Sequence, residues 1–590
     1  MEEQRGAIIV VAIVGILCIG GWAAIYLSES LLGENNDTQS IYKWEDPLIQ
    51  GGEHDHKNAT DHGQSSENVE MIEYNSLTTP GNAEIQVAEA PNGKVYAYMA
   101  GWNDVHIIDV SDPTNTTVMG VYNDPNTQVL DVKYLQYNGR EYLILQNQLV
   151  DSGYADPNIG EWDDPIQVSV TLIDVTDKNN PSYVDSWFDI DHPSGPHNLY
   201  THMIDDEWYI FVANPDYDQC DVGQGDACGG ITIAHLNFEA YGDLPRIVKV
   251  GEAEVSWETT RGGWIYIHDM TVQTWPGEDQ NDPRYGKTYI YGSYWEAGLR
   301  IFDISDLPHP QNDLTNYLWH GSLCRASGGS QAGCMWRAPE VGQWMEFADL
   351  DGDGEPDSQS TGNTNGGRAS YIHYTEPYPV MVDLGHLPGQ ESGKRHITLA
   401  AVEVLSTSVG TGMVYAIDTT EYEMINGNMR FLPKVIGDWE LPYAEDHCFG
   451  ADCEAHPEGS EWLLFSPHNL DSAHFITGDV APDQSYGGGW DGRLYVSHYH
   501  AGAWIVDLET MIALDDSMNR TERHSEETIG FIIPSYADGT VLESQFYNFD
   551  HSPYIWAAEY YDGYTYLSCI STGLYIVQLD IDVPYVGLRG

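Results

Sequence analysis

One short phrase occurs twice in the chain, and its side chains could ligate a metal ion. Residues 195–202 read GPHNLYTH and residues 466–474 read SPHNLDSAH, so Pro-His-Asn-Leu followed by a second histidine is written twice, far apart. Neutral imidazole is a common protein ligand for zinc, copper and iron. The repeat therefore indicates either a metal site assembled from distant segments or the repeat unit of a repeating fold.

The strands that would position these histidines also repeat. An alternating apolar segment that ends in an acidic turn occurs seven times: VHIIDVSDP from 105, VTLIDVTDKNNP from 170, ITIAHLNF from 231, GLRIFDISD from 298, MVYAIDTTE from 413, GAWIVDLET from 502 and GLYIVQLDI from 573. Further strand-like pieces flank each segment, with no helical period between them. Seven units of four strands predict an all-β, seven-bladed β-propeller over residues 81–590. The aspartates at the strand ends should cap the turns that follow.

Three of these segments carry a family resemblance. VHIIDVSDPTN, VTLIDVTDKNNP and GLRIFDISDLPHP resemble the LVIVD repeat, and the other four segments match it more loosely. The resemblance extends over about residues 85–590. It implies a surface-exposed or secreted β-propeller, and it does not supply a reaction.

The innermost strands of a propeller converge on its axis, so residues at equivalent strand starts meet there. The sequence places a histidine at four such starts and Asp131 at a fifth. We expect one cluster near the axis from the following set: His197, His268, His468 and His551, with His500 or Glu403 close by. Three or four of these side chains within about 2.0–2.2 Å of one ion would hold Zn, Cu or Fe.

A structural role for the same histidines is the alternative. The Asn or Asp that follows each histidine could cap a turn while the imidazole hydrogen-bonds the neighbouring blade. Units one and five lack a clear His-Asn or His-Asp phrase, although structural devices tend to recur in every blade. The sequence leaves both roles open. It predicts that His202 and His474 are structural or support the ligands from behind, because odd and even offsets on a regular strand cannot both face the channel.

A second cation site is predicted in an insertion at residues 305–370. The segment DLDGDGEPD has carboxylates at positions 1, 3, 5 and 9 of a calcium loop, a glycine at position 6 and a backbone carbonyl as a further oxygen: Asp349, Asp351, Asp353, Asp357 and, through its carbonyl, Glu355. Position 12 is Ser360 rather than glutamate, so the loop is not an EF-hand switch. We expect Ca²⁺ there to stiffen the insertion.

The N-terminus predicts a membrane anchor. Residues 6–28 are uncharged, apolar and long enough to cross a bilayer, and no cleavage site follows them. Arg5 precedes this segment and acidic residues follow it, which places the N-terminus in the cytoplasm and the bulk of the chain outside. We therefore expect a single-pass protein of the cell membrane, with an anchor at 1–28, a polar stalk at 29–80 and an extracellular propeller.

Cysteine spacing agrees with an oxidising compartment. Three close pairs predict three local disulfides: Cys220–Cys228, Cys324–Cys334 and Cys448–Cys453. The pairs lie in separate repeats, whereas a zinc site needs four ligands together. Cys569 is left over, and we expect it to be buried in a strand. Four sequons are compatible with surface glycosylation: Asn36, Asn58, Asn115 and Asn519.

Charge and motifs exclude several function classes. The chain has 91 acidic and 24 basic residues, a net charge of −67, so its surface repels nucleic acid. It contains no G-x-S-x-G, no phosphate-binding loop and no dinucleotide fingerprint. Two classes remain. One is a calcium-stabilised surface propeller that binds a protein or glycan, and the other is a metal-dependent extracellular enzyme, of oxidoreductase type, with histidine ligands at the axis.

Overall fold

The structure is a computed structural model of the whole chain, and it describes most of residues 64–580. Residues 1–63 and 581–590 are not described. Other parts that are not described, besides a few shorter gaps, are 149–168, 190–195, 215–229, 239–245, 256–266, 309–335, 346–370, 404–411, 443–465, 473–491, 514–519 and 535–553.

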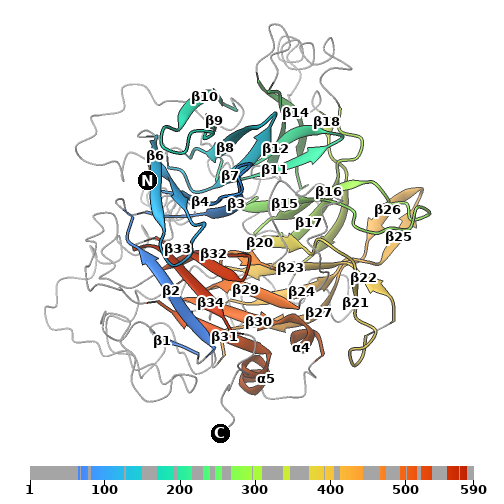
Figure 1. Cartoon of the computed structure of the whole chain (residues 1–590). Coiled ribbons are helices and arrows are strands. Elements are labelled where there is room, and N and C mark those ends of the chain that lie inside the picture. Colours follow the sequence, from blue (N-terminus) through green and yellow to red (C-terminus); the bar gives the residue numbers. More distant parts are fainter. Residues whose placement is uncertain are drawn as a thin grey trace, which may run out of the picture.

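The described residues form seven antiparallel sheets arranged as the blades of a β-propeller (Figure 1). The innermost strands contact one another in chain order, and the last contacts the first, which closes the ring. The predicted all-β, seven-bladed fold is therefore confirmed.

Blades 1 to 4 follow one another along the chain, each with its innermost strand first. Blade 1 contains β3 (Ile85–Glu89), β4 (Val95–Ala100), β5 (Asp104–Asp109) and β6 (Thr117–Asn123). Blade 2 contains β7 (Val132–Tyr137), β8 (Arg140–Gln146), β9 (Val170–Asp174) and β10 (Ser182–Trp187). Blade 3 contains β11 (Asn198–Ile204), β12 (Glu207–Asn214), β13 (Gly230–Leu236) and β14 (Ile247–Ala253), which pairs with the short β18 (Trp336–Arg337). Blade 4 contains β15 (Asp269–Thr274), β16 (Thr288–Ser293), β17 (Leu299–Asp303) and β19 (Glu340–Trp344).

Blades 5 to 7 carry additions to the same plan. Blade 5 contains β20 (Ile372–Pro377), β23 (Ile397–Val402), β24 (Val414–Asp418) and β27 (Lys434–Trp439), and two hairpins, β21 (Val382–Asp383) with β22 (Lys394–Arg395) and β25 (Tyr422–Ile425) with β26 (Asn428–Phe431). Blade 6 contains β28 (Leu470–Asp471), β29 (Arg493–Ser497), β30 (Ala503–Asp507) and β31 (Thr528–Ile533). Blade 7 contains β32 (Ile555–Tyr561), β33 (Tyr564–Cys569) and β34 (Gly573–Leu579).

The apolar core is divided among the interfaces between neighbouring blades. Each of the seven interfaces has its own cluster of buried side chains from the two sheets that meet there. Between blades 5 and 6, for example, Trp439 packs against Trp504 with 6.2 Å between their ring centroids. Because burial of apolar surface is the main stabilising term in folding, the blades depend on one another for stability.

The seven segments singled out by their repeating pattern are the third strands of the seven blades. The aspartates that end them cap turns as predicted. Asp109 accepts hydrogen bonds from the backbone N–H of Ser111 at 3.1 Å and from its hydroxyl at 2.6 Å. Asp303 caps Ser305 in the same way, with 3.0 Å from the backbone N–H to the carboxylate. These aspartates are therefore structural.

The ring is closed by strands from the predicted stalk. β2 (Val69–Asn75) is the outermost strand of blade 7, and β1 (Gln64–Ser65) adds a fifth strand to blade 6 (Figure 1). The boundary between stalk and propeller at residue 80 was wrong, because the propeller already includes residues 64–75. Val69, Met71 and Tyr74 of β2 join the apolar cluster between blades 6 and 7.

Two other predicted regions differ from the structure. The insertion at 305–370 is not entirely an excursion, because β19 lies within it and forms the fourth strand of blade 4. The buried guanidinium of Arg300 holds this strand by donating to Glu340 at 2.9 Å. Two helices, which the strand pattern did not predict, stand between β30 and β31: α4 (Leu508–Ala513) and α5 (Arg520–Glu527). α4 forms because Leu508, Met511 and Ile512 bury its apolar face.

The described residues contain no helix that is long and apolar enough to cross a membrane. The predicted anchor at residues 1–28 lies outside them.

Candidate metal centre

Four histidines from four consecutive blades gather at the propeller axis. They stand at the starts of the innermost strands of blades 3, 4, 5 and 6: His197, His268, His373 and His468. Their ring centroids are 4.2 Å apart between His197 and His268, 4.1 Å between His268 and His373, and 4.0 Å between His373 and His468. All four side chains are at least nine-tenths buried. The predicted convergence of His197, His268 and His468 is thus seen in the structure, with one further histidine between the last two.

His373 was missed in the sequence because it is followed by tyrosine rather than Asn or Asp. A signal was nevertheless present, since Tyr-Ile-His occurs both at 266–268 and at 371–373. The pairing of β20 with β23 shifts register between Ile372 and Tyr374, so His373 is the extra residue of a β-bulge. A bulge changes the direction in which a side chain points. His373 therefore reaches the axis although a strict count along the strand does not predict it.

Glu403 supplies a carboxylate to this cluster. One ligand atom from each of His268, His373 and Glu403 can be chosen so that all three lie within 4.8 Å of one another. His373 Nε2 lies 3.9 Å from a carboxylate oxygen of Glu403. Ligands about 2.0–2.2 Å from one ion are at most about 4.4 Å apart, so small ring rotations would suffice for coordination. Tyr499 donates a hydrogen bond to the other oxygen of Glu403 and so fixes the carboxylate.

Aromatic side chains back the histidines from two equivalent turns. Residues 293–298 read SYWEAG in blade 4 and residues 497–502 read SHYHAG in blade 6. The third residue of each turn, Trp295 or Tyr499, has a positive φ of 48° or 47°, which is unusual for an aromatic residue. Trp295 stacks on His268 with 4.9 Å between centroids, and Tyr499 lies 4.8 Å from His468. Such backbone strain tends to persist at functional sites, where the surroundings hold it in place.

The other blades close the cluster with different residues. In blade 7 the register shifts between Ile555 and Ala557, so Trp556 occupies the bulge that His373 occupies in blade 5. Trp556 lies 4.2 Å from His468, centroid to centroid, and its carbonyl accepts a hydrogen bond from His468 Nδ1 at 2.8 Å. In blade 2, Gln148 accepts from His197 Nδ1 at 3.4 Å. When Nδ1 carries the proton, the Nε2 lone pair of the neutral ring is available to a metal.

Burial keeps the four imidazoles neutral. Burial lowers the pKa of His197 to about 4 and that of His468 to about 3. Burial, and then the neighbouring imidazoles, hold the pKa values of His268 and His373 well below the ordinary value. A hydrogen bond to the backbone of the next histidine in the arc raises each pKa by a smaller amount. Neutral imidazole is the form that binds metals. Burial also raises the pKa of Glu403 to about 7, against the lowering caused by the hydrogen bond from Tyr499.

The comparison with protein families agrees with this fold. The family model described as the LVIVD repeat matches residues 93–124, in blade 1, and residues 285–314, in blade 4. The chain is a β-propeller protein with LVIVD repeats. No curated protein matches the chain. Among solved structures, the crystal structure of Saccharomyces cerevisiae Sqt1 is similar, with a TM-score of 0.38 and 10% identity over 87% of this chain and 85% of Sqt1.

The remaining predicted residues of this LVIVD-repeat propeller fall into two groups. Several lie outside the described residues: His551, His500, His474, the calcium loop at 349–357 and the cysteines of the three proposed disulfides. Others are described and lie apart from the metal centre. His202 is in β11 and contacts the hydroxyl of Thr274 at 3.2 Å, which agrees with a structural role. Cys569 is a free, buried cysteine at the end of β33, as expected.

Proposed function

We propose that this LVIVD-repeat propeller holds one transition-metal ion at its axis. His268, His373 and Glu403 would be the ligands, and His197 and His468 stand next in line at the two ends of the arc. The main support is that three ligand atoms, one from each of these buried side chains, lie within 4.8 Å of one another. Zn, Cu and Fe all accept two imidazoles and a carboxylate.

The geometry favours a metal over a purely structural role for the histidines. A structural device would hydrogen-bond its ring nitrogens to neighbouring groups, as His202 does with Thr274. Within the part of the chain that the structure describes, His373 Nδ1 is buried and has no hydrogen-bond partner. Leaving such a nitrogen without a partner costs free energy. If His373 coordinated a metal through either nitrogen, the ring would reorient, and the favourable coordination would offset this free-energy cost.

Three protein ligands would leave the ion at least one open position. Sites of this kind usually bind a water molecule or a substrate at that position, whereas structural zinc sites have four protein ligands. A metal-dependent extracellular enzyme is therefore the activity that the site supports best. The carboxylate of Glu403, which is close to half ionised near neutral pH, would be the group best placed to exchange a proton there.

The proposal includes a place in the cell. The uncharged segment 6–28 supports a single membrane anchor with the propeller outside, and the close cysteine pairs support an oxidising compartment. The DLDGDGEPD segment supports a calcium ion that stiffens the insertion. A protein or glycan partner on one face of the propeller remains the second candidate, because the family resemblance points to the cell surface.

Metal analysis of the purified full-length chain tests the axial site. We expect one equivalent of Zn, Cu or Fe per chain, and a His268→Ala, His373→Ala double variant should contain almost none. Calcium content should be unchanged in that variant and should fall instead in Asp351→Ala, which leaves the axial metal in place. A full complement of transition metal in the double variant would refute the axial site.

The affinity for the metal should depend on pH through Glu403 alone. The ligand histidines His268 and His373 stay neutral in mildly acidic solution because burial and the neighbouring imidazoles hold their pKa values well below the ordinary value, whereas Glu403 with a pKa of about 7 is protonated there. A metal must displace that proton, so the affinity for Zn²⁺ should fall about tenfold per pH unit below pH 7 and level off above it. Competitive Zn²⁺ titrations between about pH 5 and 7.5 measure this slope. In Glu403→Gln the slope should disappear, and an undiminished slope would assign the proton to another group.

A further inference from the structure

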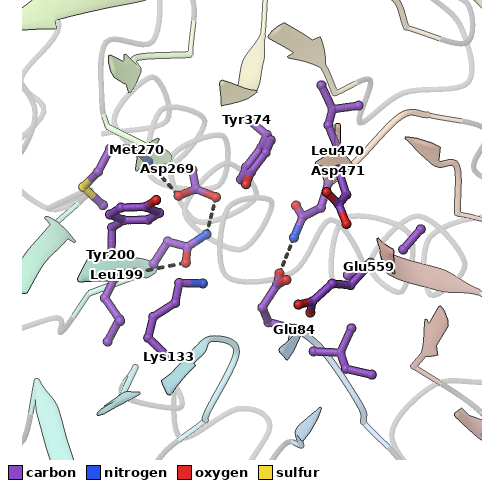
Figure 2. Close-up of a pocket in the computed structure, with 15 residues that line it drawn as sticks. Glu84, Lys133, Leu199, Tyr200, Asp269, Met270, Tyr374, Leu470, Asp471 and Glu559 are labelled. Carbon is purple, nitrogen blue, oxygen red and sulfur yellow. Dashed lines mark hydrogen bonds between the residues drawn. The ribbon is translucent and has the colours of Figure 1, made fainter. Parts of the chain in front are cut away.

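A polar cavity lies on the axis directly beside the histidine cluster. All seven innermost strands contribute to its lining (Figure 2). The space that the centre of a water molecule can occupy inside it is about 40 Å³, which suits a small ligand. Asp269 and Asn469, which line it, are the residues that follow His268 and His468 in the chain. The cavity is therefore a separate level of the same axial channel, and none of the proposed metal ligands lines it.

The lining is strongly acidic. Among the described lining residues, four carboxyl groups come from blades 1, 4, 6 and 7: Glu84, Asp269, Asp471 and Glu559. The one basic side chain among them is Lys133, and its ammonium group already lies 2.5 Å from a further carboxylate, that of Asp131. Acidic groups thus exceed the basic group in a buried space, where water cannot screen them well.

Burial, together with neighbouring carboxyl groups, raises the pKa values of two of the lining acids. Burial raises the pKa of Glu84 to about 8, with Asp131 adding to the shift against the lowering by Lys133. Burial and then Asp471 hold the pKa of Glu559 well above its ordinary range. A positive charge in the cavity would favour the ionised carboxylates and reverse these shifts.

The lining also presents hydrogen-bond acceptors. The side chain of Asn469 is 5% exposed, and it donates through Nδ2 to Glu84. In the described part of the chain its Oδ1 is buried without a hydrogen-bond partner. A buried acceptor without a partner is costly, so the lining is complementary to a ligand that brings N–H donors.

The lining carboxylates do not form a site for a metal ion. In the described residues, the only group of three or more ligand side chains close enough for one ion is His268, His373 and Glu403, and it contains no carboxylate of the cavity. Figure 2 shows the rings of Tyr200 and Tyr374 on either side of the Asp269 carboxylate. Aromatic faces beside carboxylates suit organic cations, whose charge is attracted to the ring and whose carbon atoms pack against it.

We propose that the axial cavity binds a small organic cation, an alkylammonium compound whose N–H groups meet Glu84, Glu559 and Asn469. The site does not require the metal, because its carboxylates are not metal ligands. The two proposals can therefore fail separately.

Calorimetric titration of the full-length chain, with a chelator present, tests the site. The probe is 1,4-diaminobutane, and its neutral analogue 1,4-butanediol is the control ligand. We expect saturable one-to-one binding of the diamine and none of the diol. In Glu84→Gln, Glu559→Gln the affinity should fall at least about tenfold, because buried charge partners are lost. Glu423→Gln, on the exposed face of β25, should leave it unchanged.

A second variant guards against a simple folding defect. Lys133→Gln removes the resident positive charge of the cavity and frees Asp131, so it should bind the diamine more tightly, by at least about threefold. Damage to the fold could not produce a gain in affinity. Absence of diamine binding in the native chain, equal binding of the diol, or weaker binding by Lys133→Gln would each overturn the proposal.

Discussion

Replacement of His373 by alanine is expected to weaken Zn²⁺ binding by the full-length chain at least about 100-fold, since even groups that only support a ligand commonly contribute 10–100-fold. His373 is one of the two inner members of the arc, and the ring centroids of its two neighbours, His268 and His468, lie 4.1 and 4.0 Å from its own. It is also 3.9 Å from Glu403, so its loss leaves only His268 beside the carboxylate. Competition with a chromogenic chelator would give the two affinities.

The matched control is His202→Ala. His202 is a partly buried imidazole, whereas His373 is fully buried, and burial lowers the pKa of His202 to about 4. It lies in β11, the strand that begins directly after His197, but it contacts Thr274 rather than the cluster. Both variants leave a cavity in the propeller, so both should lower the unfolding temperature, and only His373→Ala should lose metal affinity. Equal affinities in the two variants would leave the histidine arc as a structural device that ties blades together.

The fold was predictable because its signals are local. Each third strand is a mainly apolar segment of five to seven residues that ends at a turn. Where an aspartate stands at that end, it caps the turn, as Asp109 and Asp303 do. Repetition then supplies the architecture, since a four-stranded sheet must bury both faces against its neighbours. Three of the four clustered histidines and Glu403 followed from this architecture and from equivalence of position.

The parts that failed depend on non-local pairing. His373 and Trp556 reach the axis through β-bulges, which occur where one strand has an extra residue relative to its partner. His551, predicted for the start of the innermost strand of blade 7, precedes β32 and lies outside the described residues, so its place stays a prediction. β2 pairs with β34, about 500 residues away, so nothing near Val69 in the sequence reveals its partner.

Deletion of residues 1–78 is therefore expected to destabilise the whole propeller. It removes β2, which pairs with β34 from Val69↔Leu579 to Asn75↔Leu574, and it removes β1 from blade 6. Tyr74 stacks on Tyr575 with 4.7 Å between centroids and donates a hydrogen bond to the carbonyl of Thr572 at 2.8 Å. Burial of each large apolar side chain contributes about 1.5–3 kcal/mol, and a whole domain is stable by only about 5–15 kcal/mol. Losing Val69, Met71 and Tyr74 together thus removes a large part of the total.

Deletion of residues 1–60 is the control, because it shortens the chain nearly as much and leaves β1 and β2 in place. The shorter deletion should melt like the chain without any deletion, whereas the longer one should unfold at much lower temperature and become sensitive to protease in blades 6 and 7. The reason is topological. β34 becomes an unpaired edge, and the last blade then keeps only the packing of its three remaining strands, β32, β33 and β34, against blade 1. If the two deletion variants had the same unfolding temperature, residues 64–75 would not be needed to close the propeller.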